Sequence, residues 1–135
     1  MPCKFCGCVF TKPDGAIISP ESLTSFSTRN KSNCQLWIKV EANKTVKLWF
    51  NTLRLAKNSV VHILDGNHSN SKILERFTHE KQKINGDIFG SSNIISISYY
   101  FDGNLNGTNS GFRLSYSSIG KHVKIYDKKL RSRSR

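Results

Sequence analysis

Apolar and polar residues alternate along much of the chain, most clearly from residue 35 to residue 50. In residues 35–41, apolar side chains at positions 36, 38 and 40 alternate with polar ones at 35, 39 and 41, the period-2 pattern of a half-buried strand. Residues 45–50 repeat the pattern, with Val46, Leu48 and Phe50 on one face. Turn-forming residues 42–44 separate the two runs, which predicts that the runs pair as a β-hairpin.

Three later runs predict further strands. They cover residues 60–64, 94–101 and 111–116, and Asp65-Gly66 ends the first of them with a strong turn dipeptide. The one segment whose spacing is compatible with a helix is 71–84, where apolar positions are sparse. Short strands between frequent turn signals predict an all-β protein, an antiparallel β-sandwich or a barrel.

Length and composition are those of one globular domain. The chain has 135 residues, of which 37% are hydrophobic and 22% are charged. No run approaches the roughly 20 apolar residues of a membrane span. The first residues, MPCKFCG, lack the charged and apolar regions of a secretory signal, which taken alone favours the cytosol.

Two other features favour an oxidising, extracellular environment. Four Asn-x-Ser/Thr sequences occur in polar, turn-like segments, where an attached glycan would face solvent. The number of cysteines is even, as in proteins with disulfide frameworks. We therefore expect a fragment, or a mature form, of a secreted or cell-surface protein. The candidate glycosylation sites are Asn30, Asn43, Asn67 and Asn106.

Several short motifs, taken in order, resemble the CUB domain family. They are Cys-Gly at 6–7, Gly-x-Ile-x-Ser-Pro at 15–20, a cysteine and a tryptophan in 34–38, and Gly-Phe-Arg-Leu-Ser-Tyr at 111–116. The tryptophan follows the cysteine by three residues instead of the usual two. The resemblance spans residues 6–116 and implies an extracellular, jelly-roll-like β-sandwich that binds proteins or glycans.

The cysteines allow more than one arrangement. Four cysteines permit three intramolecular connectivities. The resemblance implies a disulfide between Cys6 and Cys34, which leaves Cys3 and Cys8 as a candidate second pair, or one of them for a partner chain. Four thiolates would also suffice for a zinc site. We favour structural disulfides, because Cys6 and Cys8 are one residue apart and Cys34 stands alone.

The chain also departs from the family pattern. The usual second disulfide would lie near Ser59 and Phe77, and neither is a cysteine. Two of the three carboxylate positions that bind calcium in many CUB domains fall at or near Ala56 and Ser59, which leaves only Asp102. Calcium takes six to eight oxygen ligands, several of them anionic. We therefore expect no calcium site, no other metal and no cofactor.

No catalytic pattern is recognisable. The histidines at 62, 68, 79 and 122 are scattered, and no nucleophile motif occurs, which indicates a protein that is not an enzyme. His62 is expected on the polar side of its strand. Trp37 and Trp49 have apolar neighbours, so both are assigned to core packing.

The charge is concentrated at the C-terminus. The formal net charge is +12, and the last fifteen residues, with seven cations and one aspartate, contribute +6 of it. We expect a CUB-like domain at 1–117 followed by a basic, flexible tail or linker at 118–135. Lys44, Lys47, Arg54 and Lys57 are candidates to extend a basic surface on the domain. The polyanion-binding candidates in the tail are Lys121, Lys124, Lys128, Lys129, Arg131, Arg133 and Arg135.

These features support a non-catalytic binding module of a larger secreted or cell-surface protein. Its ligand would be a protein or a glycan, including a sulfated glycosaminoglycan attracted by the clustered cations. The alternatives are a structural spacer without a ligand and a polyanion-binding protein. Nucleic acid fits the basic composition, but no helix-turn-helix, zinc finger or aromatic RNA platform is recognisable.

Overall fold

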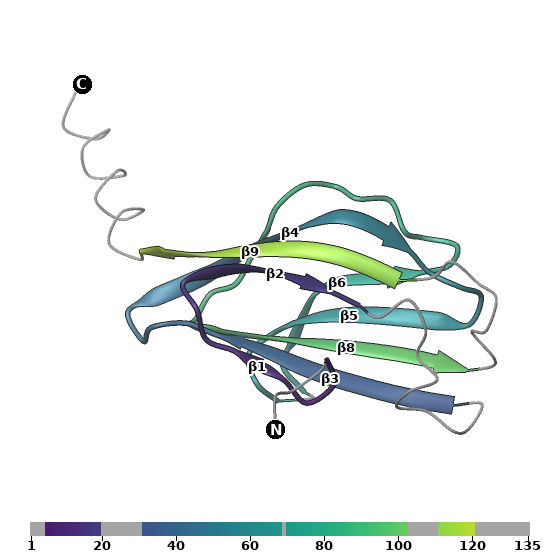
Figure 1. Cartoon of the computed structure of the whole chain (residues 1–135), viewed down its shortest axis with the longest axis horizontal. Coiled ribbons are helices and arrows are strands. Elements are labelled where there is room, and N and C mark those ends of the chain that lie inside the picture. Colours follow the sequence, from purple (N-terminus) through teal and green to yellow (C-terminus); the bar gives the residue numbers. More distant parts are fainter. Residues whose placement is uncertain (1–4, 20–30, 69, 103–110, 121–135) are drawn as a thin grey trace.

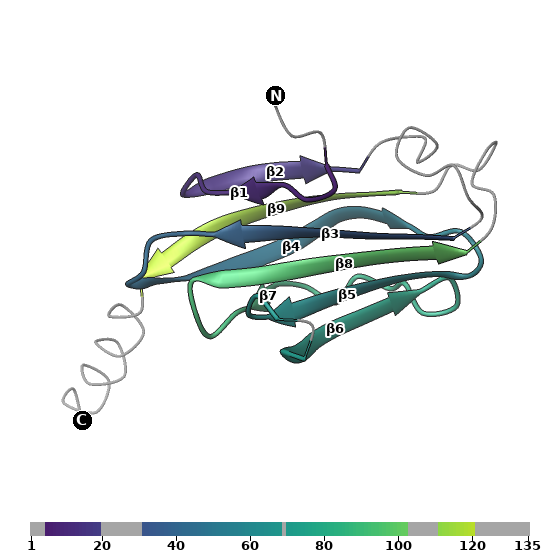
Figure 2. The same ribbon diagram turned by 90° about the horizontal axis from the view of Figure 1, so that it is seen from below.

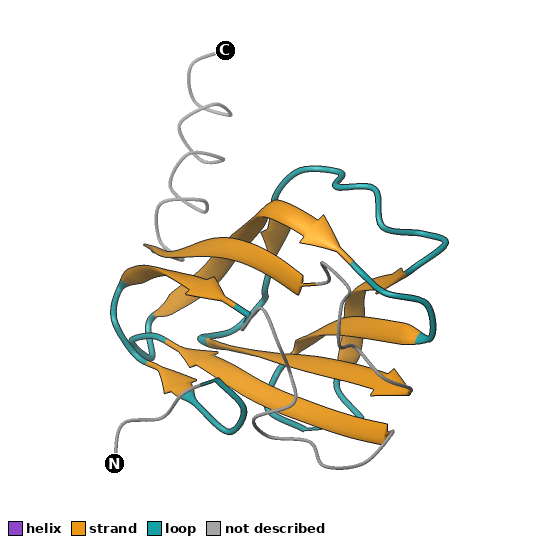
Figure 3. Ribbon diagram, turned by 45° about the vertical axis from the view of Figure 1, so that its right-hand side comes forward, coloured by secondary structure: helices purple, strands orange, loops and turns teal. Residues whose placement is uncertain are grey.

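In a computed structural model, the described residues 5–19, 31–68, 70–102 and 111–120 form two stacked β-sheets (Figures 1 and 2). These residues contain no helix (Figure 3), and hence none that could cross a lipid bilayer. The strands are β1 (Val9–Phe10), β2 (Asp14–Ile18), β3 (Lys31–Lys39), β4 (Lys44–Arg54), β5 (Ser59–Asp65), β6 (Lys72–Thr78), β7 (Ile88–Phe89), β8 (Ile94–Asp102) and β9 (Gly111–Gly120).

One sheet has the strand order β1-β3-β8-β5-β6 and the other has the order β2-β9-β4-β7. Neighbouring strands are antiparallel, except that the short β1 runs parallel to β3. The predicted all-β sandwich is therefore confirmed.

The predicted hairpin between residues 35–41 and 45–50 is wrong. The two runs are strands, but β3 belongs to the five-stranded sheet and β4 to the four-stranded sheet. The turn between them, in which the Lys44 amide donates to the Glu41 carbonyl at 3.0 Å, carries the chain from one layer to the other. Alternation fixes which face of a strand is buried, but two strands that face the same core from opposite layers alternate in the same way as two paired strands.

The helix-compatible segment 71–84 contains a strand, β6, and no helix. A register shift in the β5–β6 pairing leaves Leu74 without a partner between Ile73 and Glu75. Leu74 and Phe77 both pack on the core, although a regular strand would place them on opposite faces. This bulge gives the apolar positions of an edge strand a spacing that resembles that of a helix.

The core lies between the sheets and includes the described side chains of β3, β4, β8 and β9 that alternation predicted to face inward. On β8, Ile95, Ile97 and Tyr99 have no exposed surface, and on β9 Phe112 and Leu114 are at most 3% exposed. The inward positions of β3 and β4 are buried in the same cluster: Leu36, Ile38, Val46, Leu48 and Phe50.

Residues 5–8, which precede β1 and are called the leading segment below, are attached to β3 by a disulfide and by backbone hydrogen bonds. Cys6 and Cys34 form a disulfide with their Cα atoms 5.1 Å apart, which confirms the predicted pair. The Gly7 amide donates to the Gln35 carbonyl at 2.6 Å, and the Trp37 amide donates to the Cys8 carbonyl at 2.9 Å. Cys8 is disulfide-bonded too, whereas Cys3 lies outside the described residues. With three of the four cysteines in disulfides, the alternative of a zinc site built from four thiolates is excluded.

Candidate binding surface

The strand register places five side chains in one row across the outer face of the five-stranded sheet. Val9 pairs with Trp37, Trp37 with Ser96, Ser96 with Leu64, and Leu64 with Ile73. Paired residues project to the same face, and the neighbouring positions 36 and 38 of β3 are fully buried, so the row faces away from the core. We call these five residues the apolar band.

The apolar band is exposed at its ends and covered at its centre. Val9 is 53% and Ile73 is 49% exposed, whereas Leu64 is 5% exposed and Ser96 is completely buried. The outer face of an antiparallel sheet commonly carries polar side chains. A row of mainly apolar side chains across the whole width of a sheet is therefore a candidate interaction surface.

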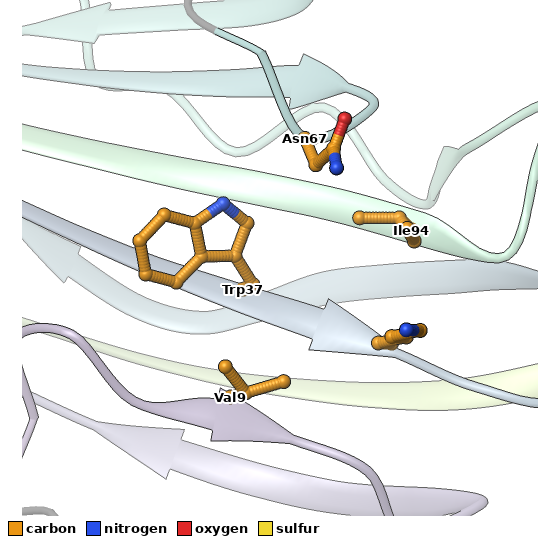
Figure 4. A pocket seen from close by; sticks show the side chains of 5 residues that line it. Val9, Trp37, Asn67 and Ile94 are labelled. Carbon is orange, nitrogen blue, oxygen red and sulfur yellow. The ribbon is translucent and has the colours of Figure 1, made fainter.

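One half of the band forms a hollow of about 390 Å³, lined by Val9, Trp37, Lys39, Asn67 and Ile94. We call it the Trp37 hollow. Figure 4 shows the Trp37 indole ring face-on, with Val9 on one side of it and Asn67 on the other. Its volume lies within the roughly 300–1,000 Å³ of small-ligand pockets, and its mix of an aromatic ring, aliphatic walls and few polar groups is typical of them.

The assignment of both tryptophans to the core is wrong. Trp37 and Trp49 are each half-buried and alternate with fully buried neighbours, so they lie on the outer faces of the two sheets. On the four-stranded sheet, the Lys47 ammonium lies 5.1 Å from the centre of the Trp49 ring, in a cation–π contact. The same ammonium lies 3.9 Å from the Asp87 carboxylate, a partly exposed ion pair of little energetic weight.

A polar row runs beside the apolar band. Gln35, Ser98, His62 and Arg76 pair in succession across β3, β8, β5 and β6, which agrees with the expected polar setting of His62. Burial, followed by the positive charge of Arg76, lowers the pKa of His62 below its usual value of 6.5. The Nε2 atom of His62 is buried and has no hydrogen-bond partner among the described residues, which also disfavours the charged ring.

This lowered pKa predicts a loss of stability in mild acid. Above pH 6.5 the ring is neutral in both states, and as the pH falls from 6.5 through the lower folded-state pKa, the unfolded chain takes up the proton first. The free energy of unfolding should therefore decrease over that interval. Urea unfolding at pH 7.5 and at successive lower pH values should show a smaller decrease for His62→Gln than for the wild type. Equal decreases in the two proteins would contradict this role of His62.

The cations proposed to extend a basic surface lie in separate places. Lys44 begins β4 and Arg54 ends it, so about 30 Å of strand separates them. Lys57 follows Arg54, whereas Lys47 lies near Lys44 and contacts Asp87. Lys44 pairs with Gly120, the last described residue of β9. The tail candidates from Lys121 to Arg135 lie outside the described residues, so the polyanion site stays a prediction. The division of the chain at 117/118 also stays a prediction, and β9 continues past it to Gly120.

Two of the four glycosylation candidates lie in the described part of the chain. Asn43, in the turn between β3 and β4, and Asn67, between β5 and β6, are both exposed. Asn30 and Asn106 lie outside the described residues. Exposure permits modification at Asn43 and Asn67 and does not test it.

The corner where the family binds calcium offers few ligands. The Ser59 amide donates a hydrogen bond to the Ala56 carbonyl at 3.1 Å. The buried Ser59 hydroxyl has no hydrogen-bond partner among the described residues. The Leu55 amide donates to the Gln82 side-chain oxygen at 2.7 Å, and the Leu55 carbonyl lies 2.8 Å from His79 Nδ1. Within the described ranges no three His, Cys, Asp or Glu residues cluster, and the Asp102 side chain lies outside them. These residues do not fit a calcium ion, whose ligands must include several carboxylates.

Comparison with known proteins identifies the family. Residues 6–116 match the CUB domain family. The chain belongs to the CUB domain family. CUB domains are in general non-catalytic protein-interaction modules in the extracellular regions of secreted or surface proteins.

Solved structures show the same architecture. The MASP-1 CUB2 domain bound to Ca²⁺ is 26% identical with a TM-score of 0.60, and the match covers 83% of this chain and 98% of that one. The CUB1-EGF-CUB2 fragment of rat MASP-1 is 16% identical with a TM-score of 0.63, covering 82% of this chain and 42% of that one. The full extracellular region of zebrafish Gpr126/Adgrg6 is 15% identical with a TM-score of 0.62, covering 87% and 15%. This CUB domain therefore spans less than half the length of the last two.

Sequence reasoning missed the apolar band. Its members come from five strands, one residue from each, so no single segment of the sequence shows it. The available signal was the position of Trp37 in its strand. It lies between Leu36 and Ile38, which alternation places in the core, so Trp37 should face outward.

Proposed function

We propose that this CUB domain is a non-catalytic, extracellular recognition module of a larger secreted or cell-surface protein, and that it binds a protein ligand through the apolar band. The observation that carries this proposal is the row of mainly apolar side chains across the outer face of the five-stranded sheet. A spacer domain has no need of such a row, because exposed apolar surface favours association. The Trp37 hollow provides the recess into which a ligand side chain would fit, and Lys39 beside it provides a cation at its rim.

The chemistry of the surface favours a protein over a polyanion as the ligand. Tryptophan is enriched among residues that dominate binding energy, particularly where surrounding groups exclude water. The candidate cations of the domain, Lys44, Lys47, Arg54 and Lys57, are divided between the two ends of β4, and Lys47 is partly neutralised by Asp87. Binding to a sulfated glycosaminoglycan or to nucleic acid would therefore depend on the basic residues after Gly120, as a separate activity.

The proposal is tested with protein refolded from bacterial expression in an oxidising buffer, so that no glycan is present. An array of secreted and cell-surface ectodomains is probed with the wild type, and each ligand found is titrated against Trp37→Ser and Trp49→Ser. Trp37→Ser should weaken binding about ten-fold or more, equivalent to about 1.4 kcal/mol. Trp49→Ser should leave the affinity within about two-fold, because its ring lies on the other sheet.

The two tryptophan variants form a matched pair. Each removes a half-buried indole from an outer sheet face, so their costs in stability should be similar, and circular dichroism checks that both remain folded. Equal losses of affinity in both variants, or none in either, would contradict binding through the apolar band. Binding that is insensitive to both variants but falls steeply with added salt would assign the ligand to the basic tail.

A further inference from the structure

We infer that Asn67 is an N-glycosylation site whose attached glycan occupies the Trp37 hollow, so that glycosylation closes the apolar band. The inference rests on the extracellular setting proposed above, because N-glycans are attached in the secretory pathway. Asn67-His68-Ser69 is an acceptor sequence, and the Asn67 side chain is exposed and lines the hollow. Figure 4 shows Asn67 at the edge of the hollow near Ile94, on the other side of the Trp37 ring from Val9.

The loop that carries Asn67 is held in place on both sides of it. Before it, the Asp65 carboxylate accepts hydrogen bonds from the Ser91 amide at 2.9 Å and the Ser91 hydroxyl at 2.6 Å. After it, the His68 amide donates to the Ser71 hydroxyl at 3.2 Å, and the Ser71 amide donates to the His68 carbonyl at 3.0 Å. Asn67 is therefore fixed at the rim of the hollow, and the first sugar starts from a defined position.

Gly66 makes the turn that directs Asn67 over the sheet. Its φ of +139° lies in a region that other residues rarely adopt, and a Cβ atom there would lie 2.7 Å from the Ser71 hydroxyl oxygen. The Gly66 amide donates to the Leu64 carbonyl at 3.1 Å, which folds the chain back immediately after the apolar band. The geometry of the loop therefore depends on a glycine at the position before Asn67.

The hollow has the chemistry of a sugar-binding surface. One face of a pyranose ring consists mainly of C–H groups and packs against the flat face of an indole, while hydroxyl groups at its edge form hydrogen bonds. Trp37 presents its ring face, Val9 and Ile94 provide apolar walls, and Lys39 provides a hydrogen-bond donor. Each contact is weak, but a short covalent link gives an effective concentration on the order of millimolar, which is enough for weak contacts to be occupied.

Occupancy at Asn67 would therefore decide the state of the surface. A glycan in the hollow covers Trp37 and Val9, the half of the apolar band that contains the recess. The same chain without this glycan presents the band to a ligand. Asn43, the other exposed acceptor in the described residues, lies in the turn between β3 and β4 and does not line the hollow, so a glycan there should not affect it.

The test measures the accessibility of Trp37 directly. The chain has two tryptophans, so Trp49→Phe leaves Trp37 as the only indole. In that background, residues 1–135 are secreted from eukaryotic cells with and without Ser69→Ala, which removes the acceptor sequence and retains Asn67. Peptide mass spectrometry gives the occupancy of each site, and acrylamide quenching gives the accessibility of the ring.

We expect the Asn67-glycosylated protein to show about a two-fold lower quenching constant than Ser69→Ala, because the sugar covers one of the two indole faces. Trimming the glycan to its first sugar should preserve most of this protection, and complete enzymatic removal should abolish it. Asn43→Gln, the matched control, should change nothing at Trp37. A glycosylated Asn67 with unchanged quenching would overturn the inference, and so would a secreted protein without a glycan there. Neither result would affect the proposed function, because the binding test uses protein without glycans.

Discussion

Replacing Phe112 by alanine is expected to lower the free energy of unfolding by about 3–5 kcal/mol. Phe112 is 3% exposed and lies at the centre of an aromatic cluster between the two sheets. Its ring centroid lies 5.7 Å from those of Phe5 and Phe50 and 5.5 Å from that of Tyr99. The side chain thus joins the leading segment, β4 and β8, and its removal leaves a cavity that none of these elements can fill alone.

Urea unfolding followed by circular dichroism measures this loss, and Phe89→Ala is the matched control. Phe89 is the same residue type, but it is 44% exposed on the outer face of β7. Its replacement should cost less than about 1 kcal/mol, because it buries far less of its surface than Phe112 and lies outside the core. Similar losses for the two variants would show that the aromatic cluster does not dominate the core.

The aromatic cluster also bears on the missing second disulfide of the family. Phe77, at one of the positions where that disulfide is expected, is 4% exposed and packs edge-to-face against Phe50 with centroids 5.1 Å apart. Ser59, at the other position, is 1% exposed. The cross-link is thus absent at these positions, and a buried aromatic contact between β6 and β4 connects the two sheets at this end of the core.

The sequence was sufficient to predict the strands β3, β4, β5, β8 and β9 and the faces that they bury, but not β1, β2, β6 or β7. Successive side chains of a strand point to opposite faces, so alternation at positions 36, 38 and 40 directly encodes which side meets the core. The fold class follows, because many such strands without a helical period can bury their apolar faces only in a sandwich or a barrel. The family resemblance supplied the Cys6–Cys34 pair, which alternation alone does not contain.

What the sequence did not reveal is which strands are neighbours. Pairing depends on contacts between distant segments, and the order β1-β3-β8-β5-β6 includes only one pair of consecutive strands, β5 and β6. The hairpin between β3 and β4 was wrong for this reason. The apolar band was missed for the same reason, because Val9, Trp37 and Ile73 become neighbours in a row only through the register of the sheet.

For Trp37, the apolar character of the side chain gave the wrong location, whereas the alternation of the strand gave the right one. Its apolar ring suggested the core, yet its position between two core residues placed it on the opposite face. On the outer face it is half-buried, with Val9 and Ser96 as its cross-strand neighbours. An outward-facing tryptophan in an alternating strand is therefore better interpreted as a candidate contact residue than as a core residue.

Removing the Cys6–Cys34 disulfide is expected to destabilise the domain by about 3.6 kcal/mol in the chain-entropy model, given a separation of 28 residues. The variant is Cys6→Ala combined with Cys34→Ala, which leaves no unpaired thiol from this bridge. The loss is a large part of the roughly 5–15 kcal/mol by which domains are stable. The two single variants should each lose about as much as the double variant, because either one removes the same cross-link. Losses in the single variants that add up in the double variant would instead indicate two independent packing defects.

The same variant should open the Trp37 hollow before the domain unfolds. The disulfide attaches the leading segment to β3, and β1, which carries Val9, has only two residues of its own to hold it there. Hydrogen exchange should therefore become faster at the Trp37 amide, which donates to the Cys8 carbonyl, and at the Gly7 amide, which donates to the Gln35 carbonyl. The core amides of β8 and β9 should exchange faster only by the factor that corresponds to the lower global stability of the variant. If all amides instead exchanged at one common rate, the leading segment would be part of the global folding unit, and the hollow would be as stable as the core.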